Sequence, residues 1–254
     1  MKAPAVTERR RISVLGQPLD ALTWDEALRR ISTWAARRES RYVCISNAHS
    51  VVTGTQDPAF GRVLREADMV TSDGAPVAWM MRRLGGAGQQ RINGPDLMWR
   101  YCALAAQRGE GIFLYGGTAD TLVLLQRRLL EAFPGLVIAG TISPPFRKPA
   151  AEELAADVAA INASGAGTVW VSLGCPKQEL WMAAQRGQVQ GVMVGVGAAF
   201  DYHAGTVRRA PLWMQRAGLE WLHRLASEPR RLWRRYLVTN SLFIWGAAKQ
   251  LLRG

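Results

Sequence analysis

Two apolar runs in the second half of the sequence each end in a cluster of polar residues. The runs Val169–Leu173 and Val192–Val196 are followed by Gly174–Glu179 and by Gly197–Asp201. In an open α/β sheet, ligands bind in the crevice beyond the carboxyl ends of the strands. Two strand ends that carry such residues therefore predict one binding crevice.

A third apolar run, Met69–Thr71, ends at Asp73 and Gly74. A carboxylate at this position can reach into a crevice and act as a base, while the glycine lets a substrate approach. Aspartate is equally suited to cap a helix there, so both interpretations stay open. Arg91 and Asp96 follow a glycine-rich loop, and they could belong to the site or form a surface ion pair.

Two further glycine turns could bind phosphate. Gly116 and Gly117 stand between an expected strand and an expected helix, where backbone N–H groups can face an anion. Gly195 and Gly197 match the first two glycines of the dinucleotide-binding pattern G-x-G-x-x-G, but Phe200 occupies the position of the third glycine. This departure favours a tight turn or another nucleotide over nicotinamide binding.

Strand and helix patterns alternate along the chain and must position these residues. A short strand at 12–15 precedes a helix whose start, Thr23–Glu26, has the pattern of a capping box. The alternation predicts a parallel sheet with helices on both faces. Further strands are expected at 42–45, 69–71, 111–115, 136–139, 169–173 and 192–196, and helices at 24–38, 57–67, 76–84, from 93, 119–133, 152–162 and 180–185.

Positive charge is concentrated at the end of the chain. The chain carries a net charge of +12, and residues 208–253 contribute ten Arg/Lys against two Glu. Such a balance implies nucleic acid, an anionic membrane or a phosphorylated substrate as a partner. We therefore divide the chain into a core, 1–207, and a basic C-terminal segment, 208–254.

The C-terminal segment has the pattern of a basic amphipathic helix. Apolar residues from Leu232 to Leu251 recur at helical spacing, next to Arg230, Arg231, Arg234 and Arg235. This pattern with tryptophans predicts an element that lies on a membrane surface. The alternative is a terminal helix packed on the core with solvated arginines.

Other classes of protein fit the sequence poorly. The three cysteines are far apart, and the N-terminus lacks an apolar signal region, so we expect a cytosolic chain. The sequence contains no Walker A, HExxH, CxxC or Asp-x-Asp motif. Arginines, lysines and helix N-termini, rather than a metal, are therefore expected to neutralise a bound diphosphate.

Together, these segments resemble the WecG/TagA/CpsF family of bacterial glycosyltransferases. The resemblance extends from about Ile12 to Tyr236. The matching motifs occur in the family's order: Asn47, Asp73-Gly74, Arg91 with Gly94–Leu97, Phe113–Gly117, Gly174–Glu179, Gly195–Gly197 with Phe200-Asp201, Arg209–Pro211, Glu220-Trp221, Arg224, Glu228–Arg230 and Arg235-Tyr236.

The resemblance implies a Rossmann-like, inverting and metal-independent enzyme without a cofactor. Such an enzyme moves a hexose or N-acetylhexosamine from a UDP-sugar to a polyprenyl-diphosphate-linked sugar, on the inner face of the cell membrane. Asp73 would be the general base, and Arg91 would stabilise the departing UDP. Whether the chain forms a homo-oligomer is left open.

The resemblance also implies two sets of binding residues. The basic residues that would meet the membrane or the acceptor are Arg224, Arg230, Arg231, Arg234 and Arg235. Many relatives carry threonine where this chain has Ile45, so the identity of the donor sugar does not carry over. The residues that would bind substrate are Asn47, Gly74, Asp96, Gly116, Gly117, Lys177, Gln178, Glu179, Gly197 and Asp201.

Two other functions remain as alternatives. A nucleic-acid-binding protein would explain the basic charge but not the clusters of polar residues at the ends of the expected strands. A nicotinamide-dependent oxidoreductase would need a complete glycine fingerprint, which the sequence lacks.

Overall fold

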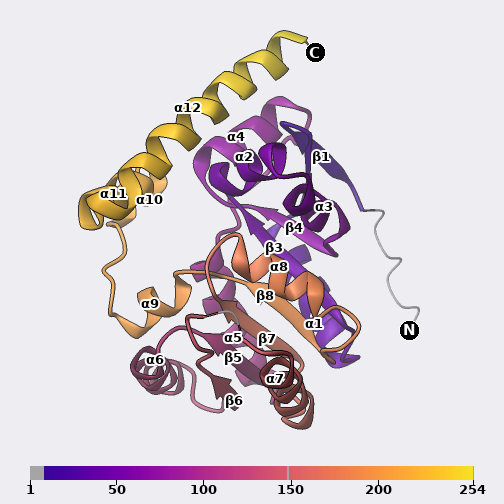
Figure 1. The fold of residues 1–254 in the computed structure, drawn as a ribbon. Helices are drawn as coiled ribbons and strands as arrows, with labels where there is room; N and C mark the ends of the chain where they lie inside the picture. Colours follow the sequence, from indigo (N-terminus) through magenta and orange to yellow (C-terminus); the bar gives the residue numbers. More distant parts are fainter. Residues whose placement is uncertain (1–8, 148, 254) are drawn as a thin grey trace.

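The computed structural model describes residues 9–147 and 149–253, and among these the side chains of Arg231 and Arg235 are not described (Figure 1). A six-stranded sheet forms the centre of the molecule. Its strands are β3 (Arg41–Ser46), β4 (Met69–Ser72), β5 (Gly111–Gly116), β6 (Val137–Ile142), β7 (Thr168–Ser172) and β8 (Val192–Gly195). They are parallel, in the order β4-β3-β8-β7-β5-β6.

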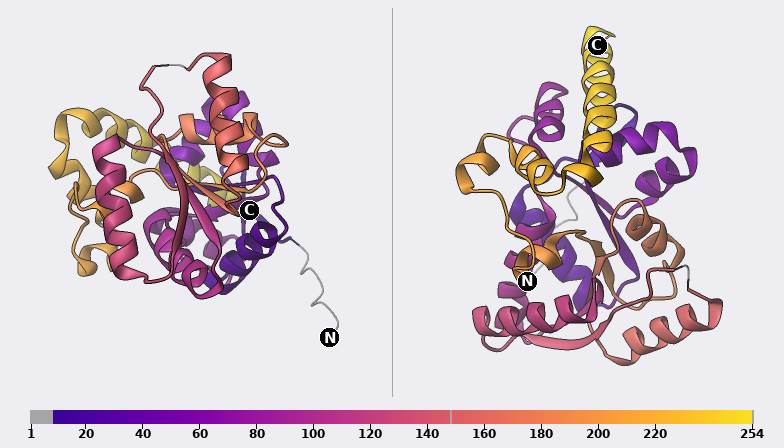
Figure 2. Two further views of the ribbon diagram at one scale, coloured as in Figure 1. Left: turned by 90° about the horizontal axis from the view of Figure 1, so that it is seen from below. Right: turned by 60° about the vertical axis from the view of Figure 1, so that its left-hand side comes forward.

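Helices cover both faces of this sheet, as the alternation of elements predicts (Figure 2). The α/β fold class expected from the sequence is therefore confirmed. The helices of the core are α1 (Trp24–Ala36), α2 (Ala48–Gln56), α3 (Pro58–Glu66), α4 (Ala75–Arg83), α5 (Gly94–Arg108), α6 (Ala119–Ala132), α7 (Ala151–Ala163), α8 (Lys177–Ala184) and α9 (Ala199–Ala204).

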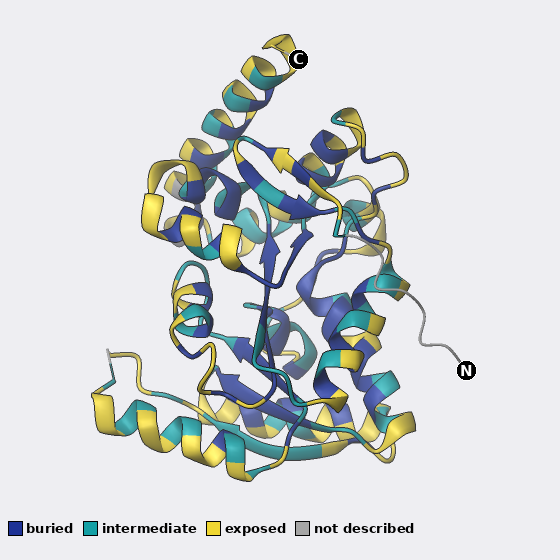
Figure 3. Ribbon diagram, turned by 90° about the vertical axis from the view of Figure 1, so that its right-hand side faces the viewer, coloured by how far each residue is buried: buried dark blue, intermediate teal, exposed yellow. Residues whose placement is uncertain are grey.

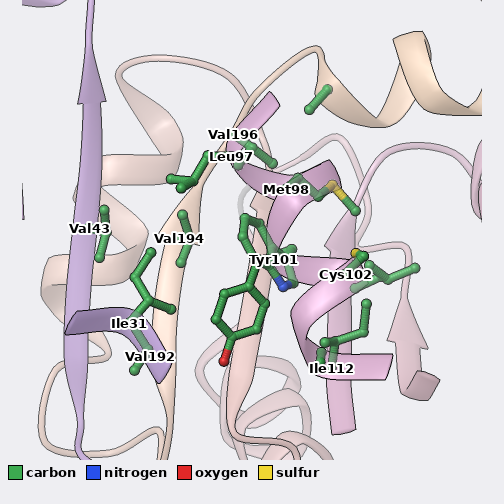
Figure 4. Packing of buried hydrophobic residues seen from close by; sticks show 14 of the residues in the cluster. Ile31, Val43, Leu97, Met98, Tyr101, Cys102, Ile112, Val192, Val194 and Val196 are labelled. Atoms are coloured by element: carbon green, nitrogen blue, oxygen red, sulfur yellow. The ribbon is translucent and has the colours of Figure 1, made fainter. Parts of the chain in front are cut away.

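The two faces of the sheet carry two separate hydrophobic cores, because successive side chains of a strand point to opposite faces. In β3, Val43 and Ile45 pack against α1 and α5, whereas Tyr42 and Cys44 face α2, α3 and α8. Figure 4 shows the first of these cores, with Tyr101 of α5 next to Val194. The inner strands of the sheet are largely buried, the edge strand β6 is half-buried, and the outer helices keep exposed sides (Figure 3).

The predicted capping box at the start of α1 is present. The Thr23 side chain accepts a hydrogen bond from the Glu26 backbone N–H, and the Glu26 carboxylate accepts one from the Thr23 N–H at 2.8 Å. These two bonds fix where the helix begins.

Three elements of the core were not expected from the sequence. The first is β2 (Gln17–Asp20), which forms a separate hairpin with β1 (Arg11–Val14), the strand expected at 12–15; Pro18 weakens the strand pattern of β2. The helix α2 contains Thr53, Gly54 and Thr55, which have modest helix propensity. The third element, α9, is a helix of only six residues.

The C-terminal segment folds into three helices, α10 (Leu212–Arg216), α11 (Glu220–Ser227) and α12 (Pro229–Arg253). One side of α12 packs on α2 and buries Phe243 and Ala247. The Gln250 side chain accepts a hydrogen bond from the Leu15 N–H and donates one to the Ser13 carbonyl, each at 2.8 Å. The terminal helix is therefore tied to the core (Figure 1).

In the part of the chain that the structure describes, no helix combines the length and the apolar character needed to cross a bilayer.

Gly116 lies where strands β5 and β7 approach each other closely at their carboxyl ends, and its substitution tests this contact. It adopts φ +117°, and a Cβ there would lie 2.4 Å from the backbone oxygen of Ser172. We expect Gly116→Ala to lower the free energy of unfolding by about 2–4 kcal/mol, measured by urea denaturation. Gly109→Ala is the control, because its φ is +64° but no atom lies within 4 Å, and it should cost only about 1–2 kcal/mol. If both variants lose the same free energy of unfolding, the close approach of Gly116 to Ser172 is contradicted.

Candidate active site

A cavity of about 590 Å³ lies at the carboxyl ends of β3, β4, β7 and β8. The C-terminal segment contributes part of its wall through α11 and α12. The sequence-predicted residues that line it are Asn47, Asp73, Gly74, Arg91, Lys177, Gln178, Glu179, Gly197 and Arg224. The structure thus brings together the three strand ends that the sequence singles out.

Other predicted residues lie outside the lining of this cavity. The Gly117 N–H donates to the Ser172 carbonyl at 3.2 Å, so it does not point freely at an anion. Asp201 accepts a hydrogen bond from the Thr206 hydroxyl at 3.3 Å, just beyond α9. The others outside the lining are Asp96, Gly116, Arg230 and Arg234, while the side chains of Arg231 and Arg235 lie outside the described part of the chain.

Gln178 joins the two polar clusters that follow β7 and β8. Its Oε1 accepts from the Gly197 N–H at 3.1 Å, and its Nε2 donates to the Glu179 carboxylate at 3.0 Å. A Cβ on Gly195 would lie 3.0 Å from Gln178 Nε2, so the glycine makes room for this side chain. The glycines at the end of β8 therefore form a tight turn, in which the Gly197 N–H donates to Gln178.

Asn47 stands at the end of β3 and caps α2. Its side-chain oxygen accepts from the Ser50 N–H at 3.1 Å. This bond holds the Asn47 side chain at the edge of the cavity. Next to it, Lys177 begins α8, where a positive side chain and a helix N-terminus face the same space.

Asp73 does not act as the cap of α4. The N-cap of that helix is Gly74, at φ +85°, and no side chain caps it. The Asp73 backbone N–H donates to the Ser46 carbonyl at 2.8 Å, which fixes the residue beside β3. Of the two interpretations of Asp73, this placement supports the one in which its carboxylate faces the cavity.

Arg91 connects Asp73 to the C-terminal segment. Its Nε donates to the Asp73 carboxylate at 3.1 Å, its Nη1 to the Gln215 carbonyl at 3.5 Å, and its Nη2 to the Glu220 carboxylate. Arg209 donates to the other Glu220 oxygen at 3.2 Å. Arg91 and Asp96, which follow the same loop, are thus paired with other residues rather than with each other.

Asp96 completes this network on α5. Its carboxylate accepts from Arg209 Nη1 at 2.5 Å and from Asn93 Nδ2 at 2.7 Å. Five charged groups, Asp73, Arg91, Glu220, Arg209 and Asp96, therefore form one continuous chain of ion pairs between the core and the C-terminal segment.

The network keeps its members charged. Burial alone would lower the pKa of the Arg91 guanidinium, but the Asp73 and Glu220 carboxylates raise that pKa above its ordinary value. Burial alone would raise the pKa of Asp96, yet hydrogen bonds from Arg209 and Asn93 hold it below its ordinary value. Both arginines and Asp96 are therefore ionised at neutral pH.

Sequence reasoning assigned no role to several residues that line the cavity. In the sequence, Glu220 belongs to the family motif Glu220-Trp221 and has no assigned role, although an acidic residue in a strongly basic segment is a signal. His49 lies at the start of α2, with its Nδ1 3.4 Å from the Thr239 hydroxyl of α12. The remaining ones include Tyr202, Trp221, Tyr236, Thr239, Asn240, Phe243 and Ile244.

The outer side of the C-terminal segment is rich in exposed apolar side chains. Basic groups lie over two of its indole rings, with Arg234 at 5.1 Å from Trp233 and Lys249 at 4.9 Å from Trp245. The exposed residues are Leu212, Trp213, Leu222, Trp233, Leu237, Val238, Trp245, Leu251 and Leu252, while Trp221 and Ile244 are also exposed but line the cavity. An accumulation of exposed apolar side chains on one segment indicates a site of interaction.

Two comparisons with known proteins bear on this site. A sequence model described as "Glycosyl transferase WecG/TagA/CpsF family" matches residues 12–254. The N-acetylglucosaminyldiphosphoundecaprenol N-acetyl-beta-D-mannosaminyltransferase of Bacillus spizizenii (strain ATCC 23059 / NRRL B-14472 / W23) is 34% identical over 207 residues, which cover 81% of this chain and 78% of that protein.

Proposed function

This chain belongs to the WecG/TagA/CpsF family of glycosyltransferases, and we propose that it moves a hexose or N-acetylhexosamine from a UDP-sugar to a polyprenyl-diphosphate-linked sugar. The family that the motifs predicted is thereby confirmed. The name of the Bacillus relative describes transfer of an N-acetylmannosaminyl group to a diphosphoundecaprenol-linked N-acetylglucosamine. We adopt the same class of acceptor for this chain.

The observation that carries the proposal is the position of Asp73. Its carboxylate lies at the edge of a cavity large enough for a nucleotide sugar, next to the Arg91 guanidinium. A carboxylate placed within reach of the acceptor hydroxyl can accept its proton, as a general base must. The described side chains include no group of three His, Cys, Asp or Glu arranged to hold a metal ion.

In the proposed reaction, Asp73 takes the proton from the acceptor hydroxyl. The acceptor oxygen then attacks the anomeric carbon of the donor from the face opposite to the UDP. The bond between that carbon and the β-phosphate oxygen breaks, so the configuration inverts and UDP leaves with the bonding electrons. Positive groups at the cavity stabilise the charge that develops on the leaving oxygen.

The donor is held by residues that line the cavity. Lys177 and Arg224 are the cations proposed to face its diphosphate, while Asn47 and Gln178 position the sugar and the uridine. Gly74 lets the substrate approach Asp73 because it carries no side chain. Asp201, Gly116 and Gly117 have no role in this proposal, since they lie outside the lining.

The C-terminal segment is proposed to hold the enzyme on the inner face of the cell membrane. Its exposed tryptophans and leucines would enter the interface, and its arginines would face anionic headgroups. Each such basic residue contributes about 1 kcal/mol to binding. This arrangement would place the cavity beside the membrane, where a lipid-linked acceptor resides.

A transfer assay tests the proposal. The full chain is incubated with a panel of UDP-sugars, a synthetic lipid-diphosphate N-acetylglucosamine and EDTA, and the release of UDP is followed. We expect one UDP-sugar to be consumed only when the acceptor is present, without added metal. Release that requires a divalent cation, or that occurs equally without acceptor, would contradict the proposed reaction.

A further inference from the structure

We propose that Glu220 is a positioning residue for the transfer reaction, because it holds the Arg91 guanidinium in place beside Asp73. This inference rests on the proposed function, in which Asp73 is the base. It assigns to the C-terminal segment a second task besides membrane contact: the alignment of the catalytic aspartate.

The Glu220 carboxylate is shared between two arginines, Arg91 of the core and Arg209 at the start of the C-terminal segment. One oxygen accepts from Arg91 Nη2 and the other from Arg209 Nε. The Glu220 side chain is only 16% exposed, so water competes little for these bonds. A carboxylate that uses both oxygens on two fixed cations has almost no freedom to turn.

Arg91 is in turn held on all three of its nitrogen atoms. The Nε atom contacts Asp73, whereas Nη1 and Nη2 contact Gln215 and Glu220 of the C-terminal segment. Because the guanidinium is planar and rigid, fixing two nitrogens fixes the direction of the third. The orientation of the Arg91–Asp73 bond is therefore set from the C-terminal segment.

The backbone around Glu220 fits closely against the core. Gly218 adopts φ +74°, and a Cβ there would lie 2.6 Å from the Cβ of Ala75, two residues after Asp73. Arg209 is anchored separately by Asp96 and Asn93 on the side of α5. Glu220 is thus held at a fixed distance from Asp73 by contacts on both sides.

Sharing Arg91 between two carboxylates also affects the chemistry. Arg91 donates to Asp73 through Nε alone, while its Nη1 and Nη2 are held by Gln215 and Glu220, so the Asp73 carboxylate receives one directed hydrogen bond from this guanidinium. The expected contribution is therefore to turnover, and not to binding of the donor.

Glu220→Gln is the first test, because glutamine keeps the shape but removes the charge that both arginines need. We expect kcat to fall roughly 10- to 50-fold while KM for the UDP-sugar changes less than about twofold. Glu131→Gln is the matched control: this glutamate pairs with Arg127 at 3.5 Å on exposed α6, and kcat should not change. Steady-state release of UDP measures both constants.

Two more variants keep the inference testable if Glu220→Gln disturbs folding. Arg209→Gln keeps the residues Asp73, Arg91 and Glu220 themselves but removes the guanidinium that anchors Glu220, so kcat should again fall with little change in KM. In an Asp73→Asn background, Glu220→Gln should reduce kcat by less than about twofold further, since Glu220 acts through Asp73. If Glu220→Gln lowers kcat by the same factor in the Asp73→Asn background as in the wild-type chain, the inference is overturned.

The outcomes separate this inference from the proposed function. If the wild-type chain transfers no sugar from any UDP-sugar, the proposed function fails. If the wild-type chain is active, Asp73→Asn shows its expected loss of kcat, and Glu220→Gln retains the wild-type kcat, only the role of Glu220 is overturned.

Discussion

Asp73→Asn is expected to lower kcat by about 10²–10⁴-fold, the usual contribution of a positioned general base. Asparagine keeps the size of the side chain and can still contact Arg91, but it cannot accept the proton of the acceptor hydroxyl. Binding of the UDP-sugar should remain close to that of the wild-type chain. Steady-state transfer kinetics and calorimetric titration of the donor measure the two effects separately.

Asp120→Asn provides the control for this substitution, because Asp120 is exposed in the first turn of α6 and does not line the cavity. It should leave kcat unchanged. An Asp73→Asn variant that is folded and turns over at nearly the wild-type rate would show that another group removes the proton.

The double variant Trp245→Ser, Leu252→Ser is expected to weaken binding to vesicles that contain anionic lipid by at least about 100-fold. These side chains are 65% and 88% exposed, and their spacing of seven residues places them on one side of α12. Burial of each large apolar side chain in the interface is worth about 1.5–3 kcal/mol, so loss of both has a large effect. Sedimentation with vesicles gives the affinity.

The chain offers a closely matched control for the vesicle experiment. Val123 and Leu130 are also exposed, also seven residues apart, and lie on α6, which is remote from α12 (Figure 1). Replacing both with serine should leave vesicle binding unchanged. Equal binding by both double variants would refute a membrane role for the outer side of α12.

The strand ends could be located from the sequence because the signals are local. Short β-rich runs that end in glycine predicted β7 and β8, and the residues after them, such as Lys177 and Gln178, do line the cavity. Parallel strands bring such ends to one edge of the sheet, whatever the details of packing. The position of Asp73 followed from the same argument.

The ion-pair network could not be predicted, because its members meet only in the folded chain. Arg91 and Glu220 are separated by 129 residues, and Arg209 and Asp96 by 113. Local spacing leaves open an ion pair between Arg91 and Asp96, but in the structure Arg91 pairs with Asp73 and Glu220, and Asp96 pairs with Arg209. The only local signal is that Glu220 is one of two glutamates in a strongly basic segment, and this signal names no partner.

The glycine turns show that a sequence pattern can also predict a binding site where the structure has none. Gly116 and Gly117 have the spacing of a phosphate-binding turn, yet Gly116 is required by the approach of Ser172 and the Gly117 N–H is used within the sheet. A glycine that permits a close backbone contact looks the same in sequence as one that faces a ligand. Their placement in three dimensions separates the two.

The most direct test of the central claim is the mass of the lipid product formed by the full chain from a UDP-sugar and lipid-diphosphate N-acetylglucosamine. The proposed function predicts that the lipid gains one hexose or N-acetylhexosamine residue for each UDP released, and that the Asp73→Asn variant forms almost none of this product. An unchanged lipid mass with every UDP-sugar, or release of free sugar into water instead of transfer, would contradict it.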